Sequence, residues 1–533
     1  MTTLDSVIEA LGGMGRFQFL SMIIVNGPRM LIGWSMLHMS YVGVTPDWWC
    51  VTSGSNLTLA KEDNSTFEEC SVNGSECPKP VFDSSMSTVV SEWGLVCDRA
   101  VIRPTIISVQ FAGILVGAFL TGQISDLFGR RYTFFAGLTL HGIFNVASSF
   151  SVAWEMFAAL RFFIGMCIGC FFVIEIPYCI EFQPKRWRSV TASLPTWNVG
   201  ISFMVLAAWL VEDWSQLHLI LGLLHVPFVL GFFVLPESVR WLAVSGRLEE
   251  SEAVVEKIAR INKKTKPSTC RQILEDVAAE EQESKKEQQK HSYLDIFRGW
   301  KIARATILLL FIWVSMSVSY YGISFGVVGL SGDIYLNIFL LNIVGSPVVF
   351  LTFWLANKFG RRYPTAILFF ISAVGGLANI AIVLKVPEDS QGTAILVLCL
   401  IARVGLECAW AIVVTHTNEL YPTSIRNLGY GAANTLTRVG GIIAPYVIDF
   451  EVIPIVSYVV IGATMGLSGV AVLLLDDTKD KALPDTILSS GFTADKTEKE
   501  KAADNGLATI QNGGEPITTN GSLGKGEFYS THL

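Results

Sequence analysis

The chain contains 533 residues, of which 51% are hydrophobic and 16% are charged, with a formal net charge of −7 and a mean hydropathy of +0.48. This composition is too apolar for a soluble domain of this length, so it excludes a soluble globular protein. It indicates a protein that crosses a membrane several times.

Apolar runs of roughly 20 residues, the length that spans a bilayer, recur along most of the chain. We predict twelve membrane-spanning helices, at 17–41, 101–123, 132–150, 155–178, 189–211, 217–235, 303–325, 333–356, 364–385, 393–417, 429–450 and 453–475. We therefore expect an all-α polytopic fold with two six-helix units, at 1–236 and 303–475.

The loop at 42–100, after the first predicted span, has the features of an extracellular segment. It contains N-glycosylation sequons at Asn56, Asn64 and Asn73 and cysteines at Cys50, Cys70, Cys77 and Cys97. Disulfides and N-linked glycans both belong to oxidising, non-cytosolic compartments. We predict a glycosylated loop held by disulfides, and the four cysteines leave three pairings open.

Two charged phrases occur once in each half of the chain. Gly129-Arg130-Arg131 returns as Gly360-Arg361-Arg362, and Glu181 with Arg188 returns at the same spacing as Glu419 with Arg426. This repetition predicts a duplicated membrane unit. Because Lys and Arg gather on alternate loops, the positive-inside rule places those loops and both termini in the cytosol.

The polar segment 237–302 is predicted to be a cytoplasmic linker with short helices. Apolar residues recur in it at near-helical spacing, at Leu248, Val254, Val255, Ile258 and Ile261, which indicates an amphipathic helix on the cytoplasmic face. The almost wholly polar stretch 280–290 is predicted to be mobile.

The tail 476–533 is rich in Gly, Asn, Thr and Lys/Glu and shows no apolar period, so we predict a disordered cytoplasmic segment. Its last residues, Thr531-His532-Leu533, resemble a carboxyl-terminal ligand of PDZ domains, which bind such a strand through its carboxylate.

Longer motifs lie at the ends of the predicted spans. They are Ser91-Glu-Trp-Gly-Leu-Val-Cys97, Gly122-Gln-Ile-Ser-Asp-Leu-Phe-Gly-Arg-Arg131, Pro236-Glu-Ser-Val-Arg-Trp-Leu242, Tyr320-Tyr-Gly-Ile-Ser324, Ile334-Tyr-Leu-Asn337 and Glu419-Leu-Tyr-Pro-Thr423 followed by Arg426-Asn427. They resemble the organic cation, anion and zwitterion transporters (solute carrier family 22 type) of the major facilitator superfamily. The resemblance covers roughly residues 1–475. It implies two six-helix bundles around a central cavity that opens alternately to each side.

The repeated charges predict a cytoplasmic gate. Asp126 precedes Arg130 by one helical turn, so carboxylate and guanidinium can pair, and Glu181 with Arg188 and Glu419 with Arg426 would complete the network. Pairs worth ~1 kcal/mol each can break in every transport cycle. The gate residues are Asp126, Arg130, Arg131, Glu181, Arg188, Arg361, Arg362, Glu419 and Arg426. The alternative is that these charges only set the topology.

The second half departs from this pattern. Asn357 stands where the first half has Asp126, and Asp476-Asp477-Thr478 stands where it has Pro236-Glu237-Ser238. We therefore expect the two gates to be unequal, with the weaker one in the carboxyl-terminal half.

Ionisable residues inside the spans are candidates for substrate binding, because a charge in the bilayer costs at least ~2.5 kcal/mol and usually faces a cavity or a partner. We identify Arg29, His38, Arg161, Glu175, Glu407 and Arg438. The resemblance singles out Arg438, whose position is typically acidic in organic cation transporters and basic in organic anion and carnitine-type transporters. The alternative is a fixed ion pair of Arg438 with Glu407 or Glu419.

Arg29 follows Asn26-Gly27-Pro28, where the proline can turn the arginine toward the cavity, and the alternative is that Arg29 pairs with Glu175. A cavity with arginine on one wall and Glu175 or Glu407 on another suits a zwitterion such as a betaine or a carnitine-like solute. His38 fits an interfacial histidine better than a proton relay.

Aromatic side chains could hold the organic part of a substrate. The available ones are Trp197, Trp313, Tyr320, Tyr321 and Trp410, of which we select Trp313 and Tyr321 for substrate contact. The alternative for each is simple packing between helices.

Other chemistry finds no support in the sequence. It has no phosphate-binding loop for ATP, no His/Cys cluster with zinc spacing and no set of nucleophile, base and orienting group, so we expect no cofactor, no metal and no enzyme. Nothing indicates nucleic-acid binding. We predict a plasma-membrane secondary or facilitative carrier of small organic ions, with anions or zwitterions favoured. The alternatives are an organic cation carrier and a non-transporting sensor or scaffold.

Overall fold

The computed structural model describes residues 4–51, 67–72, 75–77, 79–192, 194–288, 292–330, 332–422, 424–448 and 454–479. All of them belong to one compact unit, Met1–Leu483. The predictions for Asn56, Asn64 and Asn73, for the tail beyond Lys479 and for its end at Thr531-His532-Leu533 lie outside the described residues.

Each amino-terminal span predicted from the sequence corresponds to helix in the structure. The helices are α1 (Leu4–Ala10), α2 (Arg16–Asn26), α3 (Pro28–Leu37), α4 (Met39–Val42), α7 (Ile102–Phe128), α8 (Arg130–Ser149), α9 (Trp154–Ile180), α10 (Lys185–Ala192), α11 (Thr196–Val211), α12 (Trp214–Leu223), α13 (Val226–Val229) and η3 (Leu230–Phe233). The first span is interrupted before Pro28, which occupies the first position of α3 and needs no N–H there.

The carboxyl-terminal half follows the same plan. Its helices are α17 (Trp300–Phe325), η5 (Gly326–Gly329), α18 (Ile334–Ile343), α19 (Gly345–Phe359), α20 (Arg362–Lys385), α21 (Glu388–Leu420), α22 (Arg426–Val447) and α23 (Pro454–Leu473). Within the described residues, eight segments are long and apolar enough to cross a membrane. Two of the remaining predicted spans contain apolar helices that are shorter, Thr196–Val211 and Ile334–Val348.

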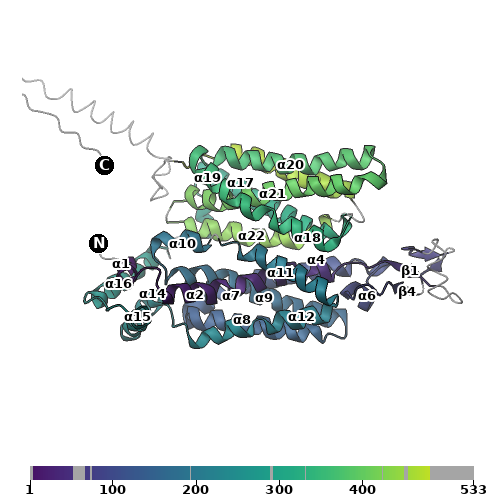
Figure 1. Cartoon of the computed structure of the whole chain (residues 1–533). Helices are drawn as coiled ribbons and strands as arrows, with labels where there is room; N and C mark the ends of the chain where they lie inside the picture. The colour runs from purple at the N-terminus through teal and green to yellow at the C-terminus, as the bar shows by residue number, and fades with distance from the viewer. Residues whose placement is uncertain are drawn as a thin grey trace, which may run out of the picture. The chain divides into compact units, whose positions relative to one another are not determined.

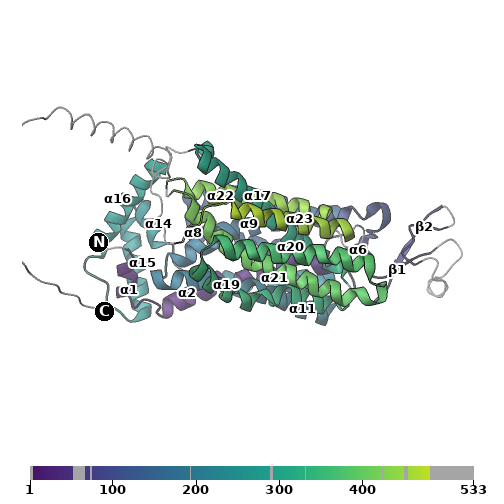
Figure 2. The ribbon, with the colours of Figure 1, turned by 90° about the horizontal axis from the view of Figure 1, so that it is seen from above.

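The two halves lie side by side in Figure 1 and one over the other in Figure 2, which looks along the direction that separates them. α7 contacts α22, and α11 contacts α18. Within the first half, α7 and α9 cross closely because glycines face the opposing backbone: a Cβ at Gly113 would stand 2.1 Å from the carbonyl oxygen of Phe162, and one at Gly165 would stand 2.1 Å from that of Gln110.

The linker after the first half is helical. It contains α14 (Val239–Val244), α15 (Leu248–Asn262), α16 (Cys270–Gln288) and η4 (Tyr293–Phe297). The predicted amphipathic helix is α15, which buries Val255 and Ile258, and its Asn262 accepts a hydrogen bond from the backbone N–H of Phe17 at 2.9 Å. The polar stretch at 280–290, which we predict to be mobile, overlaps the end of α16, whose last residue is Gln288.

The loop after the first span carries the strands of the described chain. β1 (Trp48–Cys50) pairs with β4 (Pro80–Phe82), and β2 (Ser71–Val72) pairs with β3 (Ser75–Glu76). Disulfides join Cys50 to Cys77 and Cys70 to Cys97, which resolves the pairing that the sequence left open. α6 (Val89–Trp93) and η2 (Cys97–Arg99) lead back to α7.

Figure 1 places this loop at the end of the helices opposite to α14–α16. We call its end the loop end. We call the opposite end, where Gly129-Arg130-Arg131 lies near α14, the basic-motif end.

Candidate functional site

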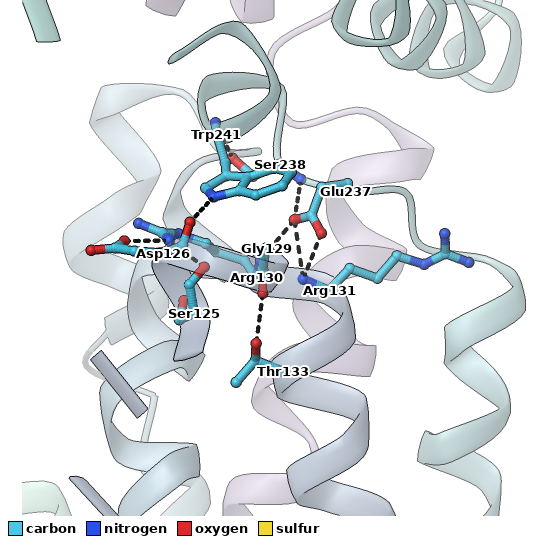
Figure 3. A network of polar contacts seen from close by, with 9 residues as sticks. All are labelled: Ser125, Asp126, Gly129, Arg130, Arg131, Thr133, Glu237, Ser238 and Trp241. Carbon is cyan, nitrogen blue, oxygen red and sulfur yellow. Dashed lines mark hydrogen bonds and ion pairs between the residues drawn. The ribbon is translucent and has the colours of Figure 1, made fainter. Parts of the chain in front are cut away.

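A carboxylate from the linker caps the turn between α7 and α8. Glu237 Oε1 accepts hydrogen bonds from the backbone N–H groups of Arg130 at 2.9 Å and Arg131 at 3.1 Å (Figure 3). Gly129 has a φ of +95°, and a Cβ there would stand 2.3 Å from Glu237 Oε2. The repeated glycine is therefore required both by the backbone and by the approaching carboxylate.

Asp126 and Arg130 form an ion pair beside this cap, with 2.7 Å between Asp126 Oδ1 and Arg130 Nη1. Arg130 Nη1 also donates to the carbonyl oxygen of Ser125 at 2.8 Å, and Trp241 Nε1 donates to that of Asp126 at 3.2 Å (Figure 3). The pairing is the one that their one-turn spacing predicts.

The second half repeats the cap with a different residue. Asp477 Oδ1 accepts from the backbone N–H of Arg361 at 3.1 Å, and a Cβ at Gly360, whose φ is +89°, would stand 2.3 Å from Asp477 Oδ2. Partial burial opposes ionisation of Asp477, but hydrogen bonds from the backbone of Arg361 and Lys479 outweigh it and lower its pKa. Asp477 thus does for α20 what Glu237 does for α8.

Asn357 has no negative charge to pair with Arg361, and Glu419 of α21 supplies that charge instead. Arg361 Nη2 lies 2.9 Å from Glu419 Oε1, and the hydroxyl of Thr478 donates to the other oxygen of Glu419. The predicted pairing of Glu419 with Arg426 is wrong, because Arg426 Nε donates to the carbonyl oxygen of Tyr421 at 3.4 Å.

The predicted pairing of Glu181 with Arg188 is also wrong. α9 ends at Ile180 and α10 begins only at Lys185, so the two residues do not share a helix face. Arg188 instead pairs with Asp5 of α1. Glu181 is enclosed at the end of α9, and burial raises its pKa despite a hydrogen bond from Ser238 and the charge of Arg130.

The second arginines of the two phrases bind carbonyl groups of their own half. Arg131 Nη2 donates to Phe232 at 2.6 Å and its guanidinium lies 4.1 Å from the centre of that ring, while Arg362 donates to the carbonyl of Leu473. Each of these contacts of the gate residues stays within one half.

A cavity of about 840 Å³ lies between the two halves and runs toward the basic-motif end. Its lining comes from α7, α9, η4 and α22 and comprises Leu115, Val116, Ala118, Phe119, Leu120, Gly122, Gln123, Asp126, Phe172, Val173, Tyr293, Gly431, Asn434, Thr435 and Arg438. Asp126 therefore stands at its mouth and Arg438 within it.

Contacts between the halves close the loop end. The hydroxyls of Tyr41 and Tyr335 are 3.0 Å apart, and the hydroxyl of Tyr446 donates to Thr105 at 2.9 Å. Deeper along the same interface, Ser108 Oγ donates to the carbonyl oxygen of Ile442 at 2.7 Å. The structure is thus open toward the basic-motif end and closed toward the loop end.

Arg438 is the cation of the cavity. Its guanidinium carbon lies 4.8 Å from the centre of the Phe172 ring, and its charge acts on the nearby Tyr321. Among the described residues no carboxylate pairs with it, since Glu419 pairs with Arg361 and Glu407 accepts from Asn198. The alternative of a fixed ion pair is therefore not what the structure contains.

Comparison with known proteins accounts for this architecture. The sequence pattern of the sugar (and other) transporter family matches residues 47–475. Organic cation/carnitine transporter 2 of Homo sapiens is 33% identical over 424 residues, 79% of this chain and 74% of the relative. The chain belongs to this transporter family, in its solute carrier 22 branch.

Other relatives and solved structures agree with the assignment. Solute carrier family 22 member 16 of Homo sapiens is 28% identical and the match covers 96% of both chains, and an organic cation transporter protein of Drosophila melanogaster is 28% identical over 94% of this chain and 97% of its own. The inward open conformation of the xylose transporter XylE from E. coli matches with a TM-score of 0.59 at 16% identity, covering 88% and 97% of the two chains. This last likeness shows the major facilitator fold, with two six-helix bundles.

The other predicted charges of the transporter's spans have protein partners. Arg29 Nε lies 3.7 Å from Glu175 Oε2, so the alternative pairing proposed for these residues is the one present. Glu407 Oε1 accepts from Asn198 Nδ2 at 2.7 Å, and Asn198 Nδ2 also lies 2.7 Å from Ser346 Oγ. Asn198, a polar residue in an apolar span, was missed by sequence analysis and joins the two bundles.

The aromatic residues of the transporter divide into two groups. Tyr321 lies at the bundle interface, with its ring centre 4.6 Å from that of Phe111. Trp313 is 1% exposed, donates to Thr417 at 3.0 Å and packs on Trp410, so it fits the packing alternative and does not line the cavity. Phe172 lines the cavity and was missed, because a phenylalanine in an apolar helix carries no distinguishing signal.

Sequence analysis also missed buried ionisable groups. Arg403 of α21 is 1% exposed and lies with its guanidinium 3.5 Å from the centre of the Tyr320 ring. His38 was predicted near the membrane interface, but it is fully buried inside the amino-terminal bundle, where it accepts from Trp34 Nε1 at 2.8 Å. Arg403 could have been identified from the sequence, because it is a charged residue within an apolar run. The burial of His38 could not, because it depends on how the helices pack.

Proposed function

We propose that this protein is a secondary or facilitative carrier of small organic ions in the plasma membrane, working by alternating access. One observation carries the proposal: Arg438, a cation without a carboxylate partner among the described residues, faces a cavity between two bundles that is closed at one end. The named relatives include organic cation and carnitine transporters, which supports an organic ion as the substrate.

The charge of Arg438 favours a substrate with a carboxylate or another anionic group. A bidentate guanidinium–carboxylate contact is among the stronger polar interactions in proteins. Phe172, which lies under Arg438, and Phe119 both line the cavity and offer apolar faces to the rest of the substrate. These faces would equally suit the cationic head of a zwitterion.

The gate residues fit a cytoplasmic gate in its open state. Arginines and lysines concentrate at the basic-motif end, which the positive-inside rule assigns to the cytosol, and the disulfide loop then faces outward. Because Asp126–Arg130 and Arg361–Glu419 pair within their own bundles, they are free to exchange partners across the interface when the cavity closes.

Uptake of labelled substrates by Arg438→Ala tests the proposal. The panel contains an organic anion, a carnitine-like zwitterion and a quaternary ammonium cation, measured at matched surface expression. Loss of a charge-assisted contact worth ~1.5–3 kcal/mol should lower anion or zwitterion uptake about tenfold or more. Arg304→Ala is the matched control, since Arg304 is exposed and donates to the carbonyl of Leu474 outside the cavity.

The two alternative functions, an organic cation carrier and a non-transporting sensor or scaffold, would each give a different result. Cation uptake that Arg438→Ala leaves unchanged would favour the cation carrier, in which Glu175 and Glu407, and not Arg438, would determine the charge of the substrate. Absence of flux for the whole panel in liposomes that contain purified wild-type protein would favour the non-transporting sensor.

A further inference from the structure

A second polar cluster lies inside the amino-terminal bundle and shares no residue with the cavity lining. Four histidines from different elements meet there: His38 after α3, His141 of α8, His218 of α12 and His225 before α13. With Arg161 of α9, they are at most 1% exposed. Within the described residues, no His, Cys, Asp and Glu side chains are grouped so as to hold a metal ion.

One branch of the cluster is satisfied with neutral histidines. His225 Nδ1 lies 2.8 Å from the carbonyl oxygen of Leu221, which only accepts, so His225 carries its proton on Nδ1. His225 Nε2 then accepts from His141 Nδ1 at 2.8 Å, and His141 Nε2 accepts from Ser35 Oγ at 3.0 Å. Both ring nitrogens of His141 and of His225 therefore have hydrogen-bond partners.

The other branch leaves atoms unmatched. Trp34 Nε1 only donates, so His38 Nδ1 is an acceptor and neutral His38 carries its proton on Nε2. Asn145 Nδ2 donates to the carbonyl of His141, so Asn145 Oδ1 accepts from His218 Nδ1 at 3.3 Å and leaves Nε2 of His218 bare. Both Nε2 atoms are buried and have no hydrogen-bond partner among the described residues.

Arg161 adds an unbalanced charge to these atoms. Its Nη2 donates to Gln110 Oε1 and to the carbonyl oxygen of Ser35, but Nε and Nη1 have no acceptor among the described residues. The side chain is fully buried and no described carboxylate pairs with it. Arg161 acts electrostatically on His38, His141 and His218, and no carboxylate is among the charges acting on those histidines.

Arg403, a buried arginine in the other bundle, has the hydrogen-bond acceptors that Arg161 lacks within the described part of the chain. Its nitrogens donate to the carbonyl oxygens of Leu341 and Tyr320, to Ser324 Oγ and to Asn342 Oδ1. Glu407, one helical turn further along α21, places a negative charge nearby. The residue one turn after Arg161 is Gly165, and Glu175 of α9 is already paired with Arg29.

We propose that Arg161 and His38 bind a small inorganic anion of about the size of chloride inside the amino-terminal bundle. Three unmatched donor nitrogens and a buried positive charge require an acceptor that is itself negative. The bare His218 Nε2 has one lone pair and no charge, so it cannot serve them all. The ring of Phe157 borders the cluster, 6.0 Å from the guanidinium carbon of Arg161 and 5.3 Å from the ring centre of His218.

Thermal unfolding of the purified protein tests this site without any transport assay, so its outcome does not depend on the proposed function. We expect replacement of gluconate by chloride at constant ionic strength to raise the unfolding temperature of the wild type by about 1–2 °C. Arg161→Gln should abolish that rise. Arg438→Ala should retain it, which separates this arginine from the one in the cavity.

A second measurement uses only the wild-type protein, so it does not depend on whether Arg161→Gln folds. Crystals grown in bromide should show an anomalous peak in contact with Arg161 Nε or Nη1 and His38 Nε2. Equal unfolding temperatures of the wild type in chloride and gluconate would overturn the proposal, as would a chloride effect lost in Arg438→Ala but kept in Arg161→Gln. A bromide map without a peak at Arg161 would also overturn it.

Discussion

Single side chains at the basic-motif end have measurable electrostatic roles. Glu237 accepts from two backbone N–H groups at the start of α8, where the helix dipole also favours a negative charge. We predict that Glu237→Ala lowers the free energy of unfolding by about 1–2 kcal/mol, the usual cost of losing a helix cap. Calorimetry in detergent measures this change.

Glu250→Ala is the control for that substitution. Glu250 pairs with Arg247 on the exposed surface of the linker, so its removal should cost less than about 0.5 kcal/mol. Equal losses in the two variants would contradict the capping role of Glu237.

Glu181 should make stability depend on pH. Burial raises its pKa in the folded state, so the folded protein holds this proton more tightly than the unfolded chain does. Stability is therefore lost as the pH rises from the ordinary value of glutamate, about 4.3, through the raised folded-state pKa. We predict that Glu181→Gln unfolds at a higher temperature than the wild type at pH 7.5 and at the same temperature near pH 4.

A pH series of unfolding temperatures checks this prediction. Glu256→Gln is the matched control, because Glu256 is 63% exposed on α15 and should leave the wild-type pH dependence unchanged. A Glu181→Gln variant less stable than the wild type at pH 7.5 would show that the ionised carboxylate is needed for folding.

The turn from α7 to α8 is tightly constrained by its backbone and by Glu237. We predict that Gly129→Ala destabilises the protein by about 1–3 kcal/mol, because the new Cβ combines an unfavourable φ with contact to Glu237. Gly122→Ala is the control on α7: nothing lies within 4 Å of its Cβ, so helix propensity should make it neutral or stabilising by up to about 1 kcal/mol. Comparable destabilisation by both variants in thermal unfolding would refute the close approach of Glu237.

Prediction from sequence succeeds for elements with a local signal. Spans such as α7 and α9 follow from length and apolarity, and α15 follows from the spacing of Val255 and Ile258. Pairings fail where they depend on which segments approach in space. Arg188 pairs with Asp5, which lies at the other end of the first half of the sequence, and Arg361 pairs with Glu419 because α21 passes beside the turn. The residues around each arginine in the sequence do not indicate either partner. The sequence shows that Asp476-Asp477-Thr478 stands where the first half has Pro236-Glu237-Ser238. It does not show that Asp477 caps the turn before α20.

The contacts between the two bundles at each end of the protein set which way the cavity opens. Tyr41 and Tyr335 close the loop end, one from each bundle, through a hydrogen bond of 3.0 Å between their hydroxyls. Tyr335→Phe removes this bond from the state open to the basic-motif end. A loss of about 1 kcal/mol should shift the balance of states about fivefold toward opening at the loop end.

A cysteine at position 434 reports that shift, since Asn434 lines the open cavity. We predict that a membrane-impermeant thiol reagent, applied from the basic-motif side of sealed vesicles, labels Asn434→Cys, and that adding Tyr335→Phe slows the labelling by up to about fivefold. Tyr363→Phe should not slow it, because Tyr363 is an exposed residue at the start of α20. Labelling from the basic-motif side that is as fast with Tyr335→Phe as without it would mean that the Tyr41–Tyr335 contact does not hold the loop end closed, and that the closure depends on contacts such as Tyr446 with Thr105.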